Sequence, residues 1–467
     1  MSYITNPLNS NASATSENKG LGYAYYVTFV LLFAYTLSFV DRQILGLLVQ
    51  PIKKDLSLAD WEFSILHGFA FAIFYTLIGI FLGRVADRWN RRNLIIIGML
   101  IWVLATGAGG YVTGFVSLFI ARMLVGVGEA ALSPAAYSIL ADYFPPERRA
   151  RAMSIYTSGV YIGSATAFIV GGLVIQAASQ GSEVVIPLLG SFKPWQAAFV
   201  YVALPGIPAL LLMYTVREPL RRGIQTLVGQ KQASTSTIAT AHAHVPAPNL
   251  SHVIQHRSAY VPLLLAPGLS GLVTFSVTAW LPATFIRQWG WTPGEIGPAY
   301  GLIILTFGIG GMLTSGFLAD YLTSRGKLVG SVAVSLCATA VLIASGLMLA
   351  YAQTPTIALV AVSITTFFLG MPVALAPPIL QSITPNQLRG QVTSIYLLIV
   401  NLIGLGCGPF LVAFFTDFVF HDEKKVGMSL GLVCAMGATI GVICLASALG
   451  PYRRLVAEMQ RAAKEAA

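Results

Sequence analysis

Residues 23–49 read YAYYVTFVLLFAYTLSFVDRQILGLLV, an apolar run long enough to cross a lipid bilayer as one helix. Two adjacent charges, Asp41 and Arg42, lie in the second half of this run. A charged side chain at such depth costs roughly 2.5–3.5 kcal/mol or more unless it is paired or hydrated. The stretch therefore predicts a membrane span whose charge pair has a functional or structural role.

The whole chain is as apolar as this stretch suggests. Its 467 residues are 56% hydrophobic and 10% charged, with a mean hydropathy of +0.74. These values exclude a soluble globular protein and predict an all-α membrane protein with twelve transmembrane helices. The predicted spans cover residues 23–49, 61–83, 93–112, 115–140, 151–177, 196–215, 259–283, 297–318, 328–351, 354–381, 391–415 and 427–449.

The positions of Lys and Arg predict the orientation. Most of the 28 Lys and Arg residues fall in segments that are inside if both termini are cytoplasmic, so the net charge of +10 reflects topology rather than a nucleic-acid surface. The short loops suggest a multi-pass protein of a bacterial inner (plasma) membrane. All four cysteines lie in apolar spans of the second half, so we expect no disulfide, no metal site and no cofactor.

Composition also divides the chain. The N-terminus is rich in Asn, Ser and Thr, and a Ser/Thr/Ala/His-rich stretch without helical periodicity separates six predicted spans from the next six. The predicted units are a disordered cytoplasmic tail at 1–22, an N-terminal six-helix bundle at 23–215, a cytoplasmic linker at 216–258, a C-terminal six-helix bundle at 259–449 and a cytoplasmic tail at 450–467.

The two halves repeat each other. Residues 144–156 align with 384–396, and 83–87 align with 316–320, at the same place in each half. The loop GRVADRWNRR at 83–92 resembles the signature of the major facilitator superfamily, with Asn90 where Gly is usual. This resemblance covers nearly all of the spans and implies two pseudo-symmetric six-helix bundles that transport by alternating access.

Charges at helix ends could gate such a transporter. A carboxylate such as Asp87 can face the positive N-terminus of a helix in the other half, and Asp320 occupies the equivalent place. These contacts would hold the inner side shut and break as the halves rock. The predicted gating residues are Asp87, Arg88, Arg91, Arg92 and Asp320. The alternative is that they are ordinary charges of inside loops.

Four charges are predicted to lie together inside the first half. The fourth helix starts near Phe115, which places Arg122 at the depth of Asp41 and Arg42. Glu129 follows Arg122 by two helical turns, so both project from one face. We predict that Asp41 offsets Arg122 and leaves Arg42 free for an anionic ligand, because guanidinium matches phosphate or carboxylate through paired donors.

The helical wheel of the first span separates the charge pair. Arg42 shares a polar stripe with Ser38 and Tyr35, which we expect to face a hydrated cavity and contact substrate. Glu129 is the candidate proton switch, with Asp41, because its protonation would respond to whether an anion occupies the arginines. The alternative is a closed network of the four charges that only fixes helix packing.

The second half predicts a different kind of surface. Most of its spans contain no Asp, Glu, Lys or Arg, and the main polar candidate is Asn401. Phe367 and Phe368 occupy the region that corresponds to the charged fourth helix. A cationic floor opposite an aromatic wall suits an amphiphile with an anionic head, although a small organic acid could also fit. The alternative is that both phenylalanines only pack against helices or lipid.

Within the superfamily, the combined pattern resembles the spinster family. The residues that carry this resemblance are FVDRQ at 39–43, GFAFA at 68–72, RMLVGVGEA at 122–130 and DYFPPERR at 142–149. The resemblance implies transport of sphingosine phosphate or lysophospholipids, as in animal members. The positions that match the family's functional charges are Asp41, Arg42, Arg122 and Glu129.

The leading hypothesis is therefore a secondary transporter of a lysophospholipid or a sphingosine-phosphate-like anion, coupled to protons. The alternatives are an organic-anion (carboxylate) symporter and a membrane sensor that binds a ligand without moving it. No nucleotide-binding loop of the GxxxxGK type occurs, so a gradient would drive transport. We expect no enzyme activity and no binding of nucleic acid. The expected partners are membrane lipids, the anionic substrate and protons, and the protein is expected to be a monomer.

Overall fold

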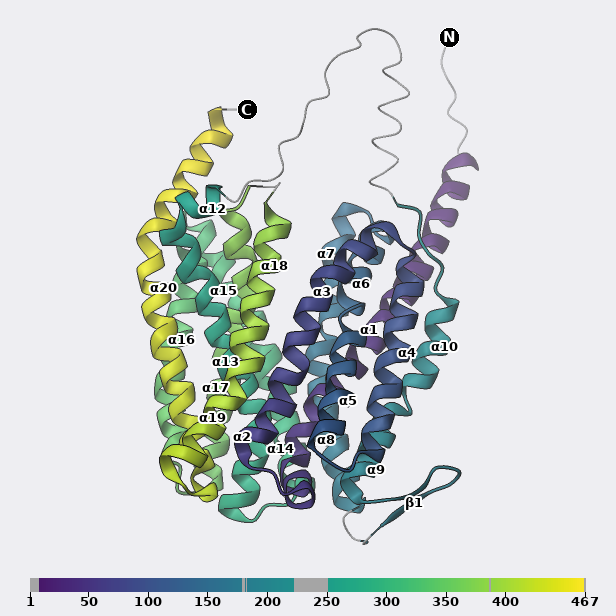
Figure 1. The fold of residues 1–467 in the computed structure, drawn as a ribbon. Coiled ribbons are helices and arrows are strands. Elements are labelled where there is room, and N and C mark those ends of the chain that lie inside the picture. Colours follow the sequence, from purple (N-terminus) through teal and green to yellow (C-terminus); the bar gives the residue numbers. More distant parts are fainter. Residues whose placement is uncertain (1–7, 179–180, 182, 222–250, 386–387, 466–467) are drawn as a thin grey trace, which may run out of the picture.

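The structure of the chain, a computed structural model, describes residues 8–178, 181, 183–221, 251–385 and 388–465. The described part contains twelve helical runs that are long and apolar enough to cross a membrane. They form two bundles of six spans that stand side by side (Figure 1). The predicted twelve-helix, two-bundle architecture is confirmed.

The N-terminal bundle begins with one long helix and includes a short hairpin. Its elements are α1 (Leu8–Leu56), α2 (Asp60–Ser64), η1 (Ile65–Phe69), α3 (Ala70–Arg88), α4 (Arg91–Ala108), η2 (Gly109–Tyr111), α5 (Phe115–Glu129), α6 (Leu132–Tyr143), α7 (Pro146–Thr157), α8 (Gly159–Ala178), β1 (Val184–Ile186), β2 (Gly190–Phe192), α9 (Pro194–Ala203) and α10 (Gly206–Thr215).

The C-terminal bundle has the same number of spans. Its elements are α12 (Ser251–Gln255), α13 (Arg257–Trp289), α14 (Pro293–Ile303), η3 (Ile304–Gly308), α15 (Ile309–Ser324), α16 (Gly330–Ala350), α17 (Pro355–Ser382), α18 (Arg389–Ile399), η4 (Val400–Cys407), α19 (Gly408–Phe414), η5 (Phe415–Phe420), η6 (Glu423–Lys425) and α20 (Val426–Glu465).

The two ends of the molecule differ. We call the end at which α1 begins, α20 ends and α12 lies the terminal end, and the end that holds the β hairpin the far end (Figure 1). The hairpin pairs β1 with β2 in antiparallel register, and Ile186 and Phe192 pack on Ala197 and Val200 of α9. This small sheet was not predicted from the sequence.

The helices extend beyond two of the predicted boundaries. Residues 8–22, which we expected to be disordered, continue α1, since extending an existing helix is much easier than starting one. Much of the predicted tail 450–467 continues α20, because Tyr452 and Leu455 are buried against the C-terminal bundle. Most of the predicted linker, residues 222–250, and residues 1–7 of the predicted tail lie outside the described residues.

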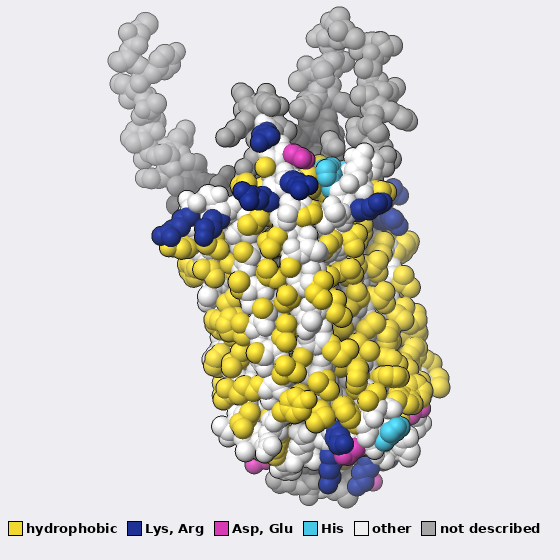
Figure 2. Space-filling model, turned by 90° about the vertical axis from the view of Figure 1, so that its left-hand side faces the viewer, with side chains coloured by type: hydrophobic (Ala, Val, Ile, Leu, Met, Phe, Trp, Pro, Cys, Tyr) yellow, Lys and Arg dark blue, Asp and Glu magenta, His cyan; other side chains and the backbone are white. Residues whose placement is uncertain are grey.

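The outer surface is suited to a bilayer. Figure 2 shows hydrophobic side chains over the middle of the C-terminal bundle and Lys and Arg near its two ends. Large apolar side chains such as Phe317, Leu347 and Ile443 are exposed on this bundle. A continuous apolar belt between charged rims is the surface expected of a multi-pass membrane protein.

Matching spans of the two bundles are interrupted where the bundles meet. The second span of each bundle contains a π-helical segment, η1 in the first and η3 in the second. The fifth span is broken between α7 and α8 in the first bundle and at η4 in the second. The segment η1 packs against η4, and η3 packs against α8. Such segments often mark functional positions. Here they lie at two contacts between the bundles, η1 with η4 and η3 with α8, which we call the two seams.

Glycine brings the bundles into backbone contact along both seams. A Cβ atom at Gly68 would lie 2.3 Å from the carbonyl oxygen of Leu405. At the other seam, a Cβ atom at Gly297 would lie 2.3 Å from the carbonyl oxygen of Phe168. No side chain fits at either point, so the two backbones can approach as closely as they do only because both positions are glycine.

The bundles are joined by polar contacts toward the far end. Among the polar contacts between the bundles in the described part of the chain are those that connect Lys53, Asp60, Trp61 and Ser64 with Arg287, Pro409, Asp417 and Glu423. These residues lie near or toward the ends of α1, α2, α13 and the η5–η6 region. The structure is therefore closed at its far end.

Candidate functional site

Four charged side chains meet in the interior of the N-terminal bundle. Asp41 and Arg42 come from α1, and Arg122 and Glu129 come from α5. They form two ion pairs: Arg122 Nη1 lies 2.9 Å from Asp41 Oδ1, and Arg42 Nε lies 2.6 Å from Glu129 Oε2. All four side chains are buried. A buried ion pair stabilises the fold only when its geometry is good, because each ion has lost its hydration shell.

Glycines hold α5 close enough for these pairs to form. A Cβ atom at Gly126 would lie 2.8 Å from the carbonyl oxygen of Phe71 in α3. A Cβ atom at Gly128 would lie 2.6 Å from the carbonyl oxygen of Gly98 in α4. The glycine spacing that carried the family resemblance thus lets α5 pack closely against α3 and α4.

The predicted neighbourhood is found, but one expectation is wrong. Asp41 pairs with Arg122, as their common depth suggested, and also accepts a hydrogen bond from Thr106 Oγ1 of α4. Arg42 is not free, because its Nε donates to Glu129. The reason is that Asp41 faces Arg122, which leaves Glu129 as the acid that balances Arg42.

Arg42 also lies in a cage of aromatic rings. Its guanidinium carbon is 4.8 Å from the ring centroid of Phe39, 4.6 Å from that of Phe71 and 4.7 Å from that of Tyr75. Each ring face attracts the cation, most strongly where water is excluded. Phe71 lies within the GFAFA motif at 68–72, but neither Phe71 nor Tyr75 was predicted to have a role. The cage makes burial of the Arg42 charge tolerable, and no hydrogen bond among the described residues uses its Nη groups.

Three buried polar atoms near this cluster have no hydrogen-bond partner among the described residues. They are Arg122 Nε, Glu129 Oε1 and His67 Nδ1. His67 belongs to η1, the segment that packs against α5 and also meets η4 of the other bundle. An unsatisfied buried polar atom costs about 1–3 kcal/mol, so these atoms are candidates to bind a ligand.

The other two predicted site residues of α1 are used inside the bundle. The ring of Tyr35 stacks on that of Tyr156 from α7, with centroids 4.5 Å apart, and meets the edge of Phe39. Ser38 is buried, and its hydroxyl donates to the carbonyl of Tyr35 at 3.0 Å. Both residues adjoin the cage, and their role in binding a substrate stays a prediction.

The predicted wall of the C-terminal bundle is engaged in its own packing. The rings of Phe367 and Phe368 meet edge to face at 5.2 Å, and Phe367 covers Gly310 and Gly311 of α15. Asn401 Nδ2 donates to the carbonyl of Leu397 at 2.8 Å. Within the described residues, no hydrogen bond or ring contact connects these three side chains with the four charges. Their contact with a substrate therefore also stays a prediction.

The predicted gating arginines fasten one bundle internally. Arg91 is buried at the start of α4, where its Nε lies 2.7 Å from Glu218 and its Nη1 contacts Asp142. The backbone N–H of Arg92 donates to the same Glu218 at 3.0 Å. These contacts hold the segment after α10 against the start of α4. A terminal-end gate is expected to be broken when the far end is closed, so a gating role stays a prediction.

No contact among the described side chains supports a gate at the other predicted gating residues, Arg88, Asp320 and Asp87. Arg88 and Asp320 are exposed, and the described part of the chain gives neither an ion pair. The side chain of Asp87 lies outside the described residues. Contacts of Asp87 with the other bundle therefore stay a prediction.

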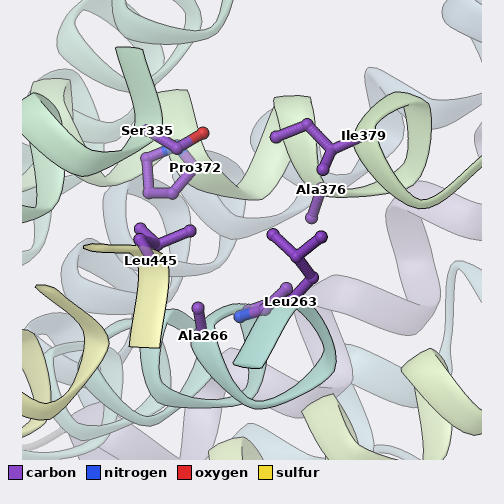
Figure 3. A pocket seen from close by; sticks show the side chains of 8 residues that line it. Leu263, Ala266, Ser335, Pro372, Ala376, Ile379 and Leu445 are labelled. Atoms are coloured by element: carbon purple, nitrogen blue, oxygen red, sulfur yellow. The ribbon is translucent and has the colours of Figure 1, made fainter. Parts of the chain in front are cut away.

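One small cavity lies elsewhere. Figure 3 shows it in the C-terminal bundle, between α13, α16, α17 and α20, next to Pro267 and Pro372. Its lining is apolar except for Ser335, whose buried hydroxyl has no partner among the described residues. It is lined only by residues of its own bundle, so it is a packing gap separate from the charged cluster.

Removing one acid of the cluster should destabilise the protein. Asp41→Asn leaves Arg122 buried without a countercharge, which is expected to lower the free energy of unfolding by about 3–5 kcal/mol. Thermal unfolding of the detergent-solubilised protein measures this. Asp55→Asn, which breaks an ion pair of the half-exposed Lys193, is the control and should cost less than about 1 kcal/mol. The double variant Asp41→Asn/Arg122→Gln should recover most of the loss; no recovery would contradict the pairing argument.

The chain is similar to known transporters along most of its length. A family model described as Major Facilitator Superfamily matches residues 31–409. An MFS-type efflux pump of Mycolicibacterium smegmatis is 28% identical over 454 residues, covering 96% of this chain and 97% of the pump. A hexuronate transporter of Bacillus subtilis is 25% identical over 399 residues, covering 84% and 87% of the two chains. Protein spinster of Drosophila melanogaster is 21% identical over 456 residues, covering 95% and 70%.

Solved structures of transporters also superpose on the chain. A bacterial homologue of the human lysosomal transporter Spinster, in an inward-facing and unoccupied conformation, superposes with a TM-score of 0.70 at 25% identity, covering 93% of this chain and 97% of that chain. A D-xylose-proton symporter superposes with a TM-score of 0.62 at 17% identity, covering 90% and 97%, which is a likeness of fold alone.

Proposed function

The chain belongs to the major facilitator superfamily of secondary transporters, and from this premise we propose that it carries an amphiphilic anion together with a proton by alternating access. The observation that carries the proposal is the buried pair of Arg42 and Glu129 inside an aromatic cage. The choice of a lysophospholipid or a sphingosine-phosphate-like substrate follows from the resemblance to the spinster family, and the likeness to a bacterial Spinster homologue supports that resemblance.

An exchange of partners on Arg42 would couple the anion to the proton. An anionic head that binds the guanidinium of Arg42 takes the place of Glu129. The displaced carboxylate is then buried without a countercharge, and a buried group in that position neutralises by taking up a proton. Asp41 stays paired with Arg122 throughout, so Arg122 takes no part in the exchange. The anion and the proton therefore bind together, which makes the cycle a symport.

The surroundings of Arg42 favour a substrate with an apolar part. Phe39, Phe71 and Tyr75 surround the guanidinium, so the atoms next to the anionic head would meet aromatic rings. The C-terminal spans add few charges. A chain or ring attached to the head would thus be buried against apolar surface, which contributes roughly 25 cal/mol per Å².

A small carboxylate is the second candidate. The chain is similar to a hexuronate transporter over most of its length. In addition, the predicted aromatic wall, Phe367 and Phe368, packs within its own bundle. A sugar acid needs polar contacts rather than a long apolar wall, and His67 Nδ1 and Glu129 Oε1 could supply them.

The orientation and the membrane can be proposed from membership of the same superfamily. We propose that the terminal end is cytoplasmic, in the inner membrane of a bacterium, with the chain acting as a monomer surrounded by lipid. In that orientation the far-end closure makes the present conformation inward-facing. Proteolysis of tags fused to both termini, in intact cells and in inverted vesicles, tests the orientation; cleavage in intact cells would reverse it.

Reconstitution separates these possibilities. Liposomes that contain the protein are given a pH step, and labelled lysophospholipid, labelled glucuronate and a neutral sugar are followed across the membrane. We expect the lysophospholipid to move with the proton gradient and the sugar to stay. Movement of glucuronate alone would favour the second candidate. Tight binding of an anion without movement would leave only a sensor.

A further inference from the structure

Four charged side chains at the far end connect the two bundles. Arg287 of α13 donates from Nη1 and Nη2 to the two carboxylate oxygens of Asp60 in α2, at 2.6 and 2.7 Å. Lys53 of α1 contacts Asp60 and also lies 3.0 Å from Glu423 Oε1 in η6. Arg287 Nη2 lies 3.8 Å from Glu423 Oε2, which closes the ring.

The centre of this ring is shielded from solvent, although it lies at the end of the bundles. The side chain of Asp60 is 0% exposed, that of Lys53 6% and that of Arg287 5%, whereas that of Glu423 is 61% exposed. A two-pronged contact between guanidinium and carboxylate is strong when it is shielded from water. The pair of Arg287 and Asp60 is therefore the main bridge, and Glu423 lies at the rim.

An apolar plug lies beneath the charges. Phe63 of the N-terminal bundle meets the edge of Trp280 of the C-terminal bundle, with ring centroids 6.2 Å apart. The guanidinium of Arg287 lies 5.4 Å from the centroid of the same Trp280 ring. The hydroxyl of Ser64 donates across the boundary to the carbonyl of Pro409 at 3.1 Å. The charges thus cover the point where the bundles close.

The division of the four charges between the bundles is what allows this closure to reverse. Lys53 and Asp60 belong to the N-terminal bundle, while Arg287 and Glu423 belong to the C-terminal bundle. If the bundles separate here, Lys53 keeps Asp60 and Arg287 keeps Glu423. Neither half is left with an unpaired charge, which is the situation that makes breaking a buried ion pair so costly.

We propose that Lys53, Asp60, Arg287 and Glu423 form an ionic latch that determines when the far end of the transporter opens. The proposal rests on alternating access as the proposed function. It assigns a gating task to residues outside the four-charge site. In the closed state the latch is a ring of four charges, and in the open state it is two separate neutral pairs. The bridge from Arg287 to Asp60 sets the balance between the two states.

Distance measurements between the bundles test the latch without any substrate. Spin labels are attached at Tyr111→Cys and Tyr351→Cys, two exposed far-end positions in different bundles, after the four native cysteines have been replaced. We expect Arg287→Gln to raise the population of long distances about tenfold relative to the parent protein, the equivalent of about 1.4 kcal/mol. Arg287→Lys should fall in between, because an ammonium keeps the charge but loses the two-pronged contact.

A matched control lies at the same end. Lys193→Gln breaks the ion pair with Asp55, which joins two parts of the N-terminal bundle only, and should leave the distances unchanged. If Arg287→Gln does not fold, Glu423→Gln at the exposed rim is the second variant, with a smaller increase expected. Distances in either latch variant that match those of Lys193→Gln would overturn the latch.

The outcomes also separate the latch from the proposed function. Longer distances in the latch variants combined with no transport in liposomes would support the latch and reject the substrate proposal. Unchanged distances combined with intact proton-linked transport would reject the latch and leave the substrate proposal standing.

Discussion

Transport of the labelled anion by the Arg42→Ala variant is expected to fall about 100-fold, the equivalent of about 2.7 kcal/mol. The substitution removes the guanidinium that would bind the anionic head, and it also leaves Glu129 without its partner. Uptake into liposomes across a pH step measures the first effect. Binding of the labelled anion to the solubilised protein shows whether affinity or movement is lost.

A second substitution separates recognition from folding. Arg42→Ala/Glu129→Gln removes both members of the buried pair, so no charge is left uncompensated and the thermal stability should return toward that of the parent. The anion should still fail to bind, because the guanidinium is absent. Parental transport in the double variant would remove Arg42 from the site. Lys193→Gln, which breaks the ion pair with Asp55 at the far end of the same bundle, is the control and should change neither binding nor transport of the anion.

Replacement of Glu129 by glutamine should separate the anion from the proton. A glutamine is neutral at every pH, so Arg42 is released from its acidic partner and can accept the anion without proton uptake. We expect anion binding to persist and to lose most of its pH dependence. A pH step should no longer drive accumulation, while exchange of labelled for unlabelled anion across the membrane continues.

Two measurements check this prediction. Anion affinity between pH 5 and pH 8 should change strongly in the parent and little in Glu129→Gln. Accumulation should be compared with counterflow in the same liposomes. A variant that still accumulates the anion on a pH step would show that the proton enters elsewhere, and His67, with its unpartnered Nδ1, would be the next residue to replace.

The architecture could be predicted because it depends on composition and spacing. Apolar length, the repeat between residues 83–87 and 316–320, and the loop at 83–92 are all local properties of the chain, and they led to twelve helices in two bundles. The pairing of Asp41 with Arg122 could be expected as well, because helical rise places both at one depth.

Other parts of the site depend on how helices rotate against each other. The partner of Arg42 was not predicted, since the choice between Glu129 and a ligand depends on packing that periodicity does not contain. The cage residue Tyr75 carried no signal beyond being aromatic in a span. The roles of the latch residues Arg287 and Glu423 could not be predicted, because their contacts with Asp60 and Lys53 join segments more than two hundred residues apart. The π-helical breaks likewise left no pattern in the sequence.

The exchange of partners on Arg42 has an electrical consequence. The empty site holds Arg42 and a charged Glu129, and the loaded site holds Arg42, a monovalent anion and a neutral Glu129, so the net charge of this pair is zero in both forms. Asp41 and Arg122 contribute zero throughout. Neither the loaded nor the empty carrier would then move charge across the membrane, where each elementary charge is worth about 2.3 kcal/mol per 100 mV. Transport of a monovalent substrate would be electroneutral, so it would follow the pH gradient and be indifferent to the membrane voltage.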